Sequence, residues 1–228
     1  MKKKKITPSI LGYGEDSLTL RLLQNWGQRK ALSDQLKEDF DITLNQKKTE
    51  VFYRPSFGRG YVGEPDFVIF TRNSNSTKWY WIIGESKWDK SNEISKRNEL
   101  RLGKGQEVVR IDKLRNLLEF WHKYRSSANG EWAAYYQEIG EAFQINKNVR
   151  LKDSTLISTV ADFLKRADNF FPPGAKVELL ALVLVFIPLR HPEVRFAQDS
   201  GSGMKLLNIP YAKGSFINIG FIGKKGSK

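Results

Sequence analysis

The chain has 228 residues, of which 40% are hydrophobic and 28% charged, which is the composition of a globular protein and not of a disordered chain. It has no cysteine and only two histidines, which excludes disulfides and a thiolate nucleophile and argues against a histidine-rich metal site. Its 38 Lys and Arg residues outnumber 25 Asp and Glu residues and give a formal net charge of +13, which is common in proteins that bind nucleic acid, although such a charge can also serve solubility alone.

The length suits a single domain over residues 1–228, with basic tails at 1–6 and 223–228 that we expect to be disordered. No apolar signal core follows the basic N-terminus. The longest apolar run, at residues 177–187, is too short to cross a bilayer. We therefore expect a soluble cytoplasmic protein with no membrane partner.

The first half of the chain predicts one helix and several strands. Leucines at helical spacing predict a helix over residues 16–39. Short extended segments at 41–44 and 49–54 lead into a glycine-rich connection at 55–65. Two strands are then expected at 67–71 and 78–87, and because the residues between them have turn composition, we expect them to form an antiparallel hairpin.

The second half predicts helices and then strands. A polar, basic stretch ends near residue 104, and a helix is expected from Gln106 to Tyr124, ended by Asn129-Gly130. Further helices are expected near 131–143 and 154–167. Residues 177–187 predict a strand buried on both faces, and residues 204–222 predict a C-terminal hairpin. The series predicts an α/β fold in which a mixed sheet is flanked by helices.

The chemically informative residues lie at the two open ends of the expected 67–87 hairpin. Side chains alternate along a strand, so Glu85 and Lys87 share one face. Asp66 precedes the first strand of the hairpin, and antiparallel pairing places the start of that strand beside the end of the second. The hairpin therefore predicts that Asp66, Glu85 and Lys87 lie close together.

Two adjacent carboxylates repel each other unless a cation lies between them, and oxygen ligands favour Mg²⁺, for which Mn²⁺ can substitute. A bound Mg²⁺ polarises a phosphodiester and lowers the pKa of its water, while a lysine beside it orients the water or stabilises charge. The trio thus predicts phosphodiester hydrolysis. The simpler alternative is a surface salt bridge at a hairpin end.

These residues resemble a known superfamily. Pro65-Asp66 followed by Glu85-Ser86-Lys87 at the end of an apolar strand is similar to the motif of the PD-(D/E)xK nucleases, which include restriction endonucleases and Holliday-junction resolvases. The resemblance covers roughly residues 15–125. It implies a core in the order helix, strand, strand, strand, helix, strand, with Asp66 and Glu85 as metal ligands and Lys87 as the catalytic lysine.

The resemblance also implies residues outside the trio. Glu15, at the start of the first helix, matches a glutamate that many members direct at the metal; alternatively it is an acidic residue favourably placed at a helix N-terminus. Gln106 matches a glutamine that some members carry on the following helix. Glu64 could also reach the metal.

Basic residues flank the trio and are candidates for contact with a phosphate backbone, although a solvated loop would have the same composition. The candidates are Arg54, Arg59, Lys90, Lys96, Arg97, Arg101 and Lys104.

The sequence thus predicts a Mg²⁺-dependent DNA endonuclease, of the type II restriction kind, with a homodimer expected by analogy. A Holliday-junction resolvase or repair nuclease of the same fold is the alternative within the enzymes. A non-catalytic nucleic-acid-binding protein is the alternative of another class, and an RNA-binding scaffold that uses some of the six tryptophans is a third.

Overall fold

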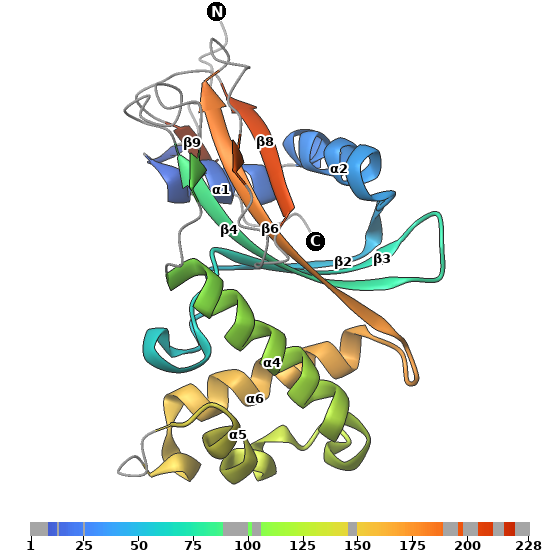
Figure 1. Ribbon diagram of the computed structural model, residues 1–228, viewed down its shortest axis with the longest axis vertical. Coiled ribbons are helices and arrows are strands. Elements are labelled where there is room, and N and C mark those ends of the chain that lie inside the picture. Colours follow the sequence, from blue (N-terminus) through green and yellow to red (C-terminus); the bar gives the residue numbers. More distant parts are fainter. Residues whose placement is uncertain are drawn as a thin grey trace, which may run out of the picture.

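The computed structural model describes residues 9–12, 14–24, 26–88, 100–101, 106–145, 150–188, 196–197, 205–211 and 217–221. It confirms the mixed α/β class, because helices flank a central sheet that contains both antiparallel and parallel strands. Figure 1 shows this sheet in the upper half of the molecule, with the helices α4, α5 and α6 gathered below it.

The central sheet has five strands in the order β2-β3-β4-β6-β8. The first three pair antiparallel, while β4, β6 and β8 are parallel to one another. The strand β6 therefore lies between two partners, and its residues 181–186 are all buried, as the apolar run at 177–187 predicts. The bounds are β2 Leu44–Tyr53, β3 Phe67–Asn73, β4 Trp79–Trp88, β6 Val177–Pro188 and β8 Lys205–Tyr211.

One face of the sheet is covered by α1 (Glu15–Gln24) and α2 (Trp26–Phe40). The leucines that predict a helix in this region, Leu18, Leu22, Leu32 and Leu36, are all buried against strand residues such as Ile69 and Ile82. The structure has two helices in place of the single expected one: α1 ends at Gln24 and α2 begins at Trp26. The expected segments at 41–44 and 49–54 instead belong mostly to one strand, β2, with an irregularity between Leu44 and Thr49.

The other face is covered by the helices that follow β4 in the chain. Their apolar residues, among them Leu117, Trp121 and Leu164, pack with Phe70 and Trp81 of the sheet in one core. The bounds are α4 Gln106–Ala128, the 3₁₀ helix η2 Trp132–Tyr135, α5 Tyr136–Ala142, the 3₁₀ helix η3 Leu151–Asp153 and α6 Thr155–Phe170. Left-handed backbone at Asn129 and Gly130 (φ 44° and 82°) ends α4, as expected.

The C-terminal strands do not form the expected hairpin. Strand β8 pairs with β6, whereas β9 (Ile217–Phe221) pairs antiparallel with β1 (Ser9–Gly12) in a separate two-stranded sheet. A second small sheet joins β5 (Leu100–Arg101) to β7 (Phe196–Ala197). The turn composition of residues 212–214 predicts that β8 and β9 pair with each other, but each pairs with a strand far away in the sequence.

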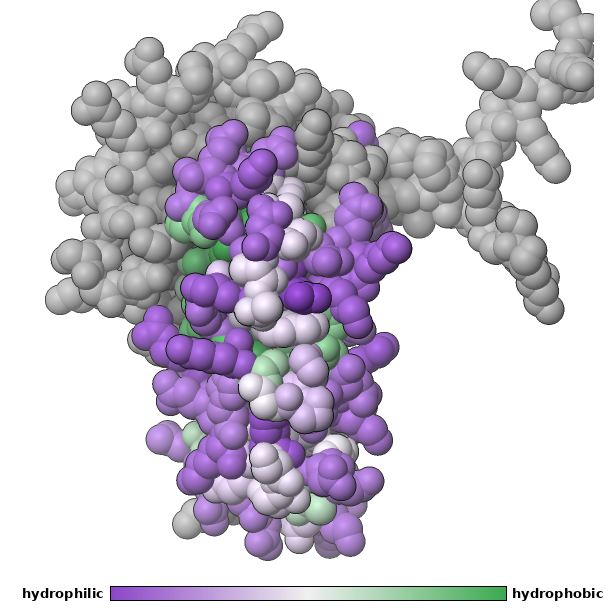
Figure 2. All heavy atoms as spheres, turned by 90° about the vertical axis from the view of Figure 1, so that its right-hand side faces the viewer, coloured by the Kyte–Doolittle hydropathy of each residue, from purple (hydrophilic) through white to green (hydrophobic). Residues whose placement is uncertain are grey.

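The described surface is mainly hydrophilic in the view of Figure 2, where hydrophobic residues show in the recesses between outer polar side chains. In the parts of the chain that the structure describes, no helix combines the length and the apolar character needed to cross a membrane.

Candidate active site at the end of strand β4

The register of the β3–β4 hairpin sets the geometry of the candidate site. Phe67 pairs with Gly84 at the end of this register, and Asp66 and Glu85 are their next neighbours along the chain. The hairpin is therefore confirmed, and it brings Asp66 and Glu85 to the same end of the β3–β4 pair.

Gly84 is needed for this register because the ring of Phe67 lies across it. A Cβ atom at position 84 would come within 1.8 Å of Phe67 Cζ. The glycine thus admits the ring on the α1 side of the sheet, while the neighbouring Glu85 lies on the opposite side, in alternation with Trp81 and Ile83.

Glu85 is a buried carboxylate at the end of an apolar strand, with only 1% of its surface exposed. A carboxylate at this depth needs a proton, a cationic side chain or a metal ion to offset its lost hydration. Lys87, two residues further along β4, is half-buried on the same face.

Asp66 is held by the strand that it faces. The Ser86 backbone N–H donates a 2.7 Å hydrogen bond to Asp66 Oδ2. Burial raises the pKa of Asp66 above its ordinary value, and this shift is opposed by the Ser86 hydrogen bond and by the positive charges of Lys87 and Arg54. The structure thus brings Asp66 and Lys87 within electrostatic reach of each other.

Helix α1 docks on the same end of β4 through a short polar chain. Thr19 Oγ1 donates a 2.8 Å hydrogen bond to Ser86 Oγ, and a 2.9 Å contact also joins it to the carbonyl oxygen of Glu15. Thr19 and Ser86 are both buried. The first turn of α1, with Glu15 and Asp16, is therefore fixed beside the end of the strand that carries Glu85 and Lys87.

The end of β2 completes the site on the far side of Asp66. The Arg54 backbone N–H donates a 2.9 Å hydrogen bond to the carbonyl oxygen of Asp66. Arg54 Nη1 donates to Asp16 Oδ2 at 2.6 Å, and the Tyr53 hydroxyl donates to the Asp16 carbonyl oxygen at 3.0 Å. Burial, followed by the charge of Asp16, raises the pKa of Tyr53.

The donor set suits a hard divalent cation. Mg²⁺ is commonly held by one or two carboxylates, with water and substrate oxygens completing its shell, and Asp66 and Glu85 offer such a pair. Within the described residues, no three or more carboxylate, histidine or cysteine side chains gather into a group that could hold a metal ion. A role for Glu15 as a third ligand stays a prediction.

Several predicted contact residues fall outside the described part of the chain, namely Lys90, Lys96, Arg97 and Lys104. Arg59, Arg101 and Gln106 have a described backbone only, within a π-helical turn at Gly58–Val62, within β5 and at the start of α4 respectively. Arg54 is fully described and lies at the site. Glu64 accepts a 2.7 Å hydrogen bond from Ser56 Oγ.

Asp16, Thr19 and Tyr53 were not among the predicted site residues. Tyr53 could have been found from strand pairing. In an antiparallel pair the end of one strand lies beside the start of the next, so the end of β2 must lie beside the start of β3 and Asp66. For Asp16 and Thr19 the sequence gives helical spacing alone, and only the docking of α1 shows which strand they meet.

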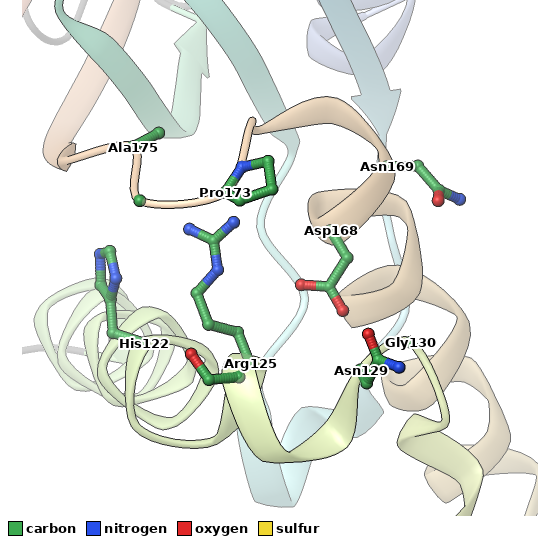
Figure 3. A pocket seen from close by; sticks show the side chains of 10 residues that line it. His122, Arg125, Asn129, Gly130, Asp168, Asn169, Pro173 and Ala175 are labelled. Atoms are coloured by element: carbon green, nitrogen blue, oxygen red, sulfur yellow. The ribbon is translucent and has the colours of Figure 1, made fainter.

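A separate cavity of about 500 Å³ lies between the C-terminal ends of α4 and α6, and Arg125, Asp168 and His122 line it (Figure 3). Both charged groups in its wall have partners within the protein. Asp168 accepts hydrogen bonds from the indoles of Trp121 and Trp132, and Arg125 donates to the carbonyl oxygens of residues 171 and 172. Burial lowers the pKa of His122. The cavity adjoins the start of β6, at the opposite end of the sheet from Glu85.

Comparison with protein-family models, with curated proteins and with solved structures finds no match for this chain.

Proposed function

We propose that this protein is a metal-dependent nuclease that hydrolyses phosphodiester bonds of DNA, with Asp66, Glu85 and Lys87 as its catalytic residues. The observation that carries the proposal is Glu85, a buried carboxylate two residues before Lys87 on β4, the strand whose Ser86 N–H binds Asp66. A surface salt bridge does not account for a carboxylate that is 1% exposed.

The order of elements supports the resemblance to the PD-(D/E)xK nucleases. Helices α1 and α2 precede three antiparallel strands, β2, β3 and β4, which are followed by α4 and, after further helices, by the parallel strand β6. This is the succession of helix, three strands, helix and strand that the resemblance implies. The inserted η2, α5, η3 and α6 lie between α4 and β6.

In the proposed reaction a water molecule adds to phosphorus and one P–O ester bond breaks, which leaves one phosphate end and one hydroxyl end. A divalent ion held by Asp66 and Glu85 would supply polarisation of the phosphate and a water of lowered pKa. The Ser86 N–H keeps Asp66 oriented. Lys87 would orient the water and stabilise the negative charge that develops on the phosphate.

The test is cleavage of supercoiled plasmid DNA by the full chain with Mg²⁺ and with EDTA. We expect nicked or linear products with Mg²⁺ only, and their loss in Asp66→Asn, Glu85→Gln and Lys87→Ala. The matched control is Lys78→Ala, because Lys78 precedes the start of β4, where it pairs with Glu178 at 3.2 Å, far from the end that carries Glu85.

The products also separate the substrate classes. Discrete fragments would indicate a type II restriction enzyme, and cutting confined to branched or damaged DNA would indicate a resolvase or repair nuclease. Salt-sensitive DNA binding without cutting of any of these substrates would contradict the nuclease and favour a non-catalytic nucleic-acid-binding protein.

A further inference from the structure

Arg54 has an uncommon backbone conformation for an arginine. Its φ of 46° lies in the left-handed region, which glycine adopts freely and which asparagine and aspartate tolerate through their short polar side chains. Pro55 follows, and a residue before proline is normally restricted to extended conformations. Strain of this kind persists where the surrounding structure imposes it, and it is concentrated at functional sites.

The contacts of Arg54 show what imposes the conformation. Its backbone N–H is bound to the Asp66 carbonyl oxygen, and its guanidinium is bound to the Asp16 carboxylate. The Tyr53 hydroxyl holds the backbone of the same Asp16. The strained residue therefore connects the end of β2 to the first turn of α1 directly beside Asp66.

The Arg54 guanidinium is still open to a ligand. The side chain is 40% exposed, its Nη1 binds Asp16, and it also makes a side-chain hydrogen bond with Tyr53. A guanidinium has five N–H donors in a planar fork that matches two oxygens of a phosphate. The bonds to Asp16 and Tyr53 thus orient the fork without using all five of its donors.

The charges around the site make such a cation useful. Asp16, Asp66 and Glu85 place three carboxyl groups at this end of the sheet, and they would repel a polyanion. The positive charges of Arg54 and Lys87 both act on Asp66. Of these two cations Lys87 is assigned to the reaction itself, so Arg54 is the one of the pair that can attract and position the substrate backbone.

We propose that Arg54 binds a backbone phosphate of the nucleic acid at the edge of the sheet that carries Asp66, and that Asp16 orients its guanidinium before the substrate arrives. This inference rests on the proposed nuclease function and adds that the site contacts the phosphate backbone of the substrate. The competing explanation is an ion pair that only fastens β2 to α1.

The test measures binding of a labelled DNA duplex in EDTA, where no cleavage is expected, over a series of salt concentrations. The variants are Arg54→Gln, Arg54→Gly and Asp16→Asn, with Lys78→Gln as the control that removes a positive charge at the other end of β4. Thermal unfolding of each protein and plasmid cleavage with Mg²⁺ are measured in parallel. Glycine suits the left-handed backbone at position 54, so Arg54→Gly removes the guanidinium and relieves the strain.

We expect Arg54→Gln and Arg54→Gly to weaken binding roughly tenfold, as the loss of a charged hydrogen bond does. The slope of log K against log salt should fall by about one, the mark of one lost phosphate contact. Arg54→Gly should unfold at the wild-type temperature or higher. Asp16→Asn and Lys78→Gln should keep the wild-type slope.

Two results would overturn the inference. One is an unchanged salt slope in both Arg54 variants. The other is a parallel loss of binding and thermal stability in Arg54→Gln and Asp16→Asn, which is what a purely structural ion pair predicts. If the wild type binds the duplex but cuts neither plasmid nor branched or damaged DNA, the nuclease proposal fails, while the Arg54 variants still test the phosphate contact. If the wild type binds no duplex at all, both proposals fail.

Discussion

Asp66 is the residue at which burial and charge oppose each other most clearly. Burial raises its pKa, whereas the Ser86 hydrogen bond, Lys87 and Arg54 lower it, and burial is the larger effect. The carboxylate is thus held in a place where its ionised form is costly without a cation. A metal ion bound to the ionised carboxylate would offset this cost and so stabilise the folded protein.

Asp66→Asn should raise the free energy of unfolding at neutral pH. Because the folded-state pKa lies above the unfolded value, the unfolded chain loses this proton first, and stability falls as pH rises until the folded group has also ionised. Urea unfolding in EDTA at neutral pH and below pH 3.8, the ordinary pKa, should show the gain only at neutral pH. The exposed Asp34 supplies the control, Asp34→Asn. A gain of equal size at both pH values would contradict the argument.

Mg²⁺ should raise the unfolding temperature of the wild type in a concentration-dependent manner, because a ligand that binds only the folded state stabilises it. The effect should shrink as pH falls below the pKa of Asp66, since protons compete with the metal for the carboxylate. It should be lost in Asp66→Asn and Glu85→Gln. A thermal shift that persists in both variants would place the metal elsewhere.

Gly84→Ala should destabilise the protein by about 1–3 kcal/mol or more, because the added methyl group overpacks the core against Phe67. Urea unfolding measures the change. A matched control is Gly130→Ala, where a Cβ meets no atom within 4 Å and only the left-handed backbone opposes it. If Phe67→Leu restores part of the lost stability to Gly84→Ala, the clash is the cause.

At the scale of elements, the sequence predicts what neighbouring residues decide. The β3–β4 hairpin follows from two apolar runs around a turn, and alternation then gives the shared face of Glu85 and Lys87. The separation of β8 from β9 could not be predicted, because each pairs with a strand far away in the sequence. For the same reason the sequence did not reveal that Asp16 of α1 meets the end of β2 at Tyr53.

Asp168 links three helical elements in the region below the sheet. Its two oxygens accept 2.8 Å and 2.5 Å hydrogen bonds from Trp121 of α4 and Trp132 of η2, while Asp168 itself belongs to α6. Both tryptophans are buried. The carboxylate thus fastens together the helices that cover one face of β4.

Asp168→Ala should lower the free energy of unfolding by about 2–4 kcal/mol, because two buried indole N–H groups lose their acceptor. Trp132→Phe removes one donor together with its bond and should cost less. Chemical unfolding measures both. At temperatures where Asp168→Ala is fully folded its plasmid cleavage should match the wild type; a loss of cleavage under those conditions would assign the carboxylate a role in the site.

At the scale of the molecule, β8 covers one edge of β6, whose other edge is paired with β4. Strand β6 is buried, and β8 pairs with it from Leu182 to Pro188. A chain that ends before residue 205 would leave this apolar strand with an open edge, which is a template for association between molecules. Size-exclusion chromatography of a variant lacking residues 205–228 should show oligomers or aggregates, whereas a variant lacking only residues 223–228 should elute as the full chain does. A truncation at 204 that elutes like the full chain would show that β8 is dispensable.

The parallel pairing of β4 with β6 also has a consequence for synthesis. Trp79 pairs with Val177, so the strand that carries Glu85 leaves the ribosome well before its second partner exists. At ~5–20 residues per second, translation of the intervening roughly 100 residues takes about 5–20 s. During that interval the nascent hairpin exposes one unpaired apolar edge, which makes this stage of biosynthesis the one at which a holdase chaperone would benefit the protein most.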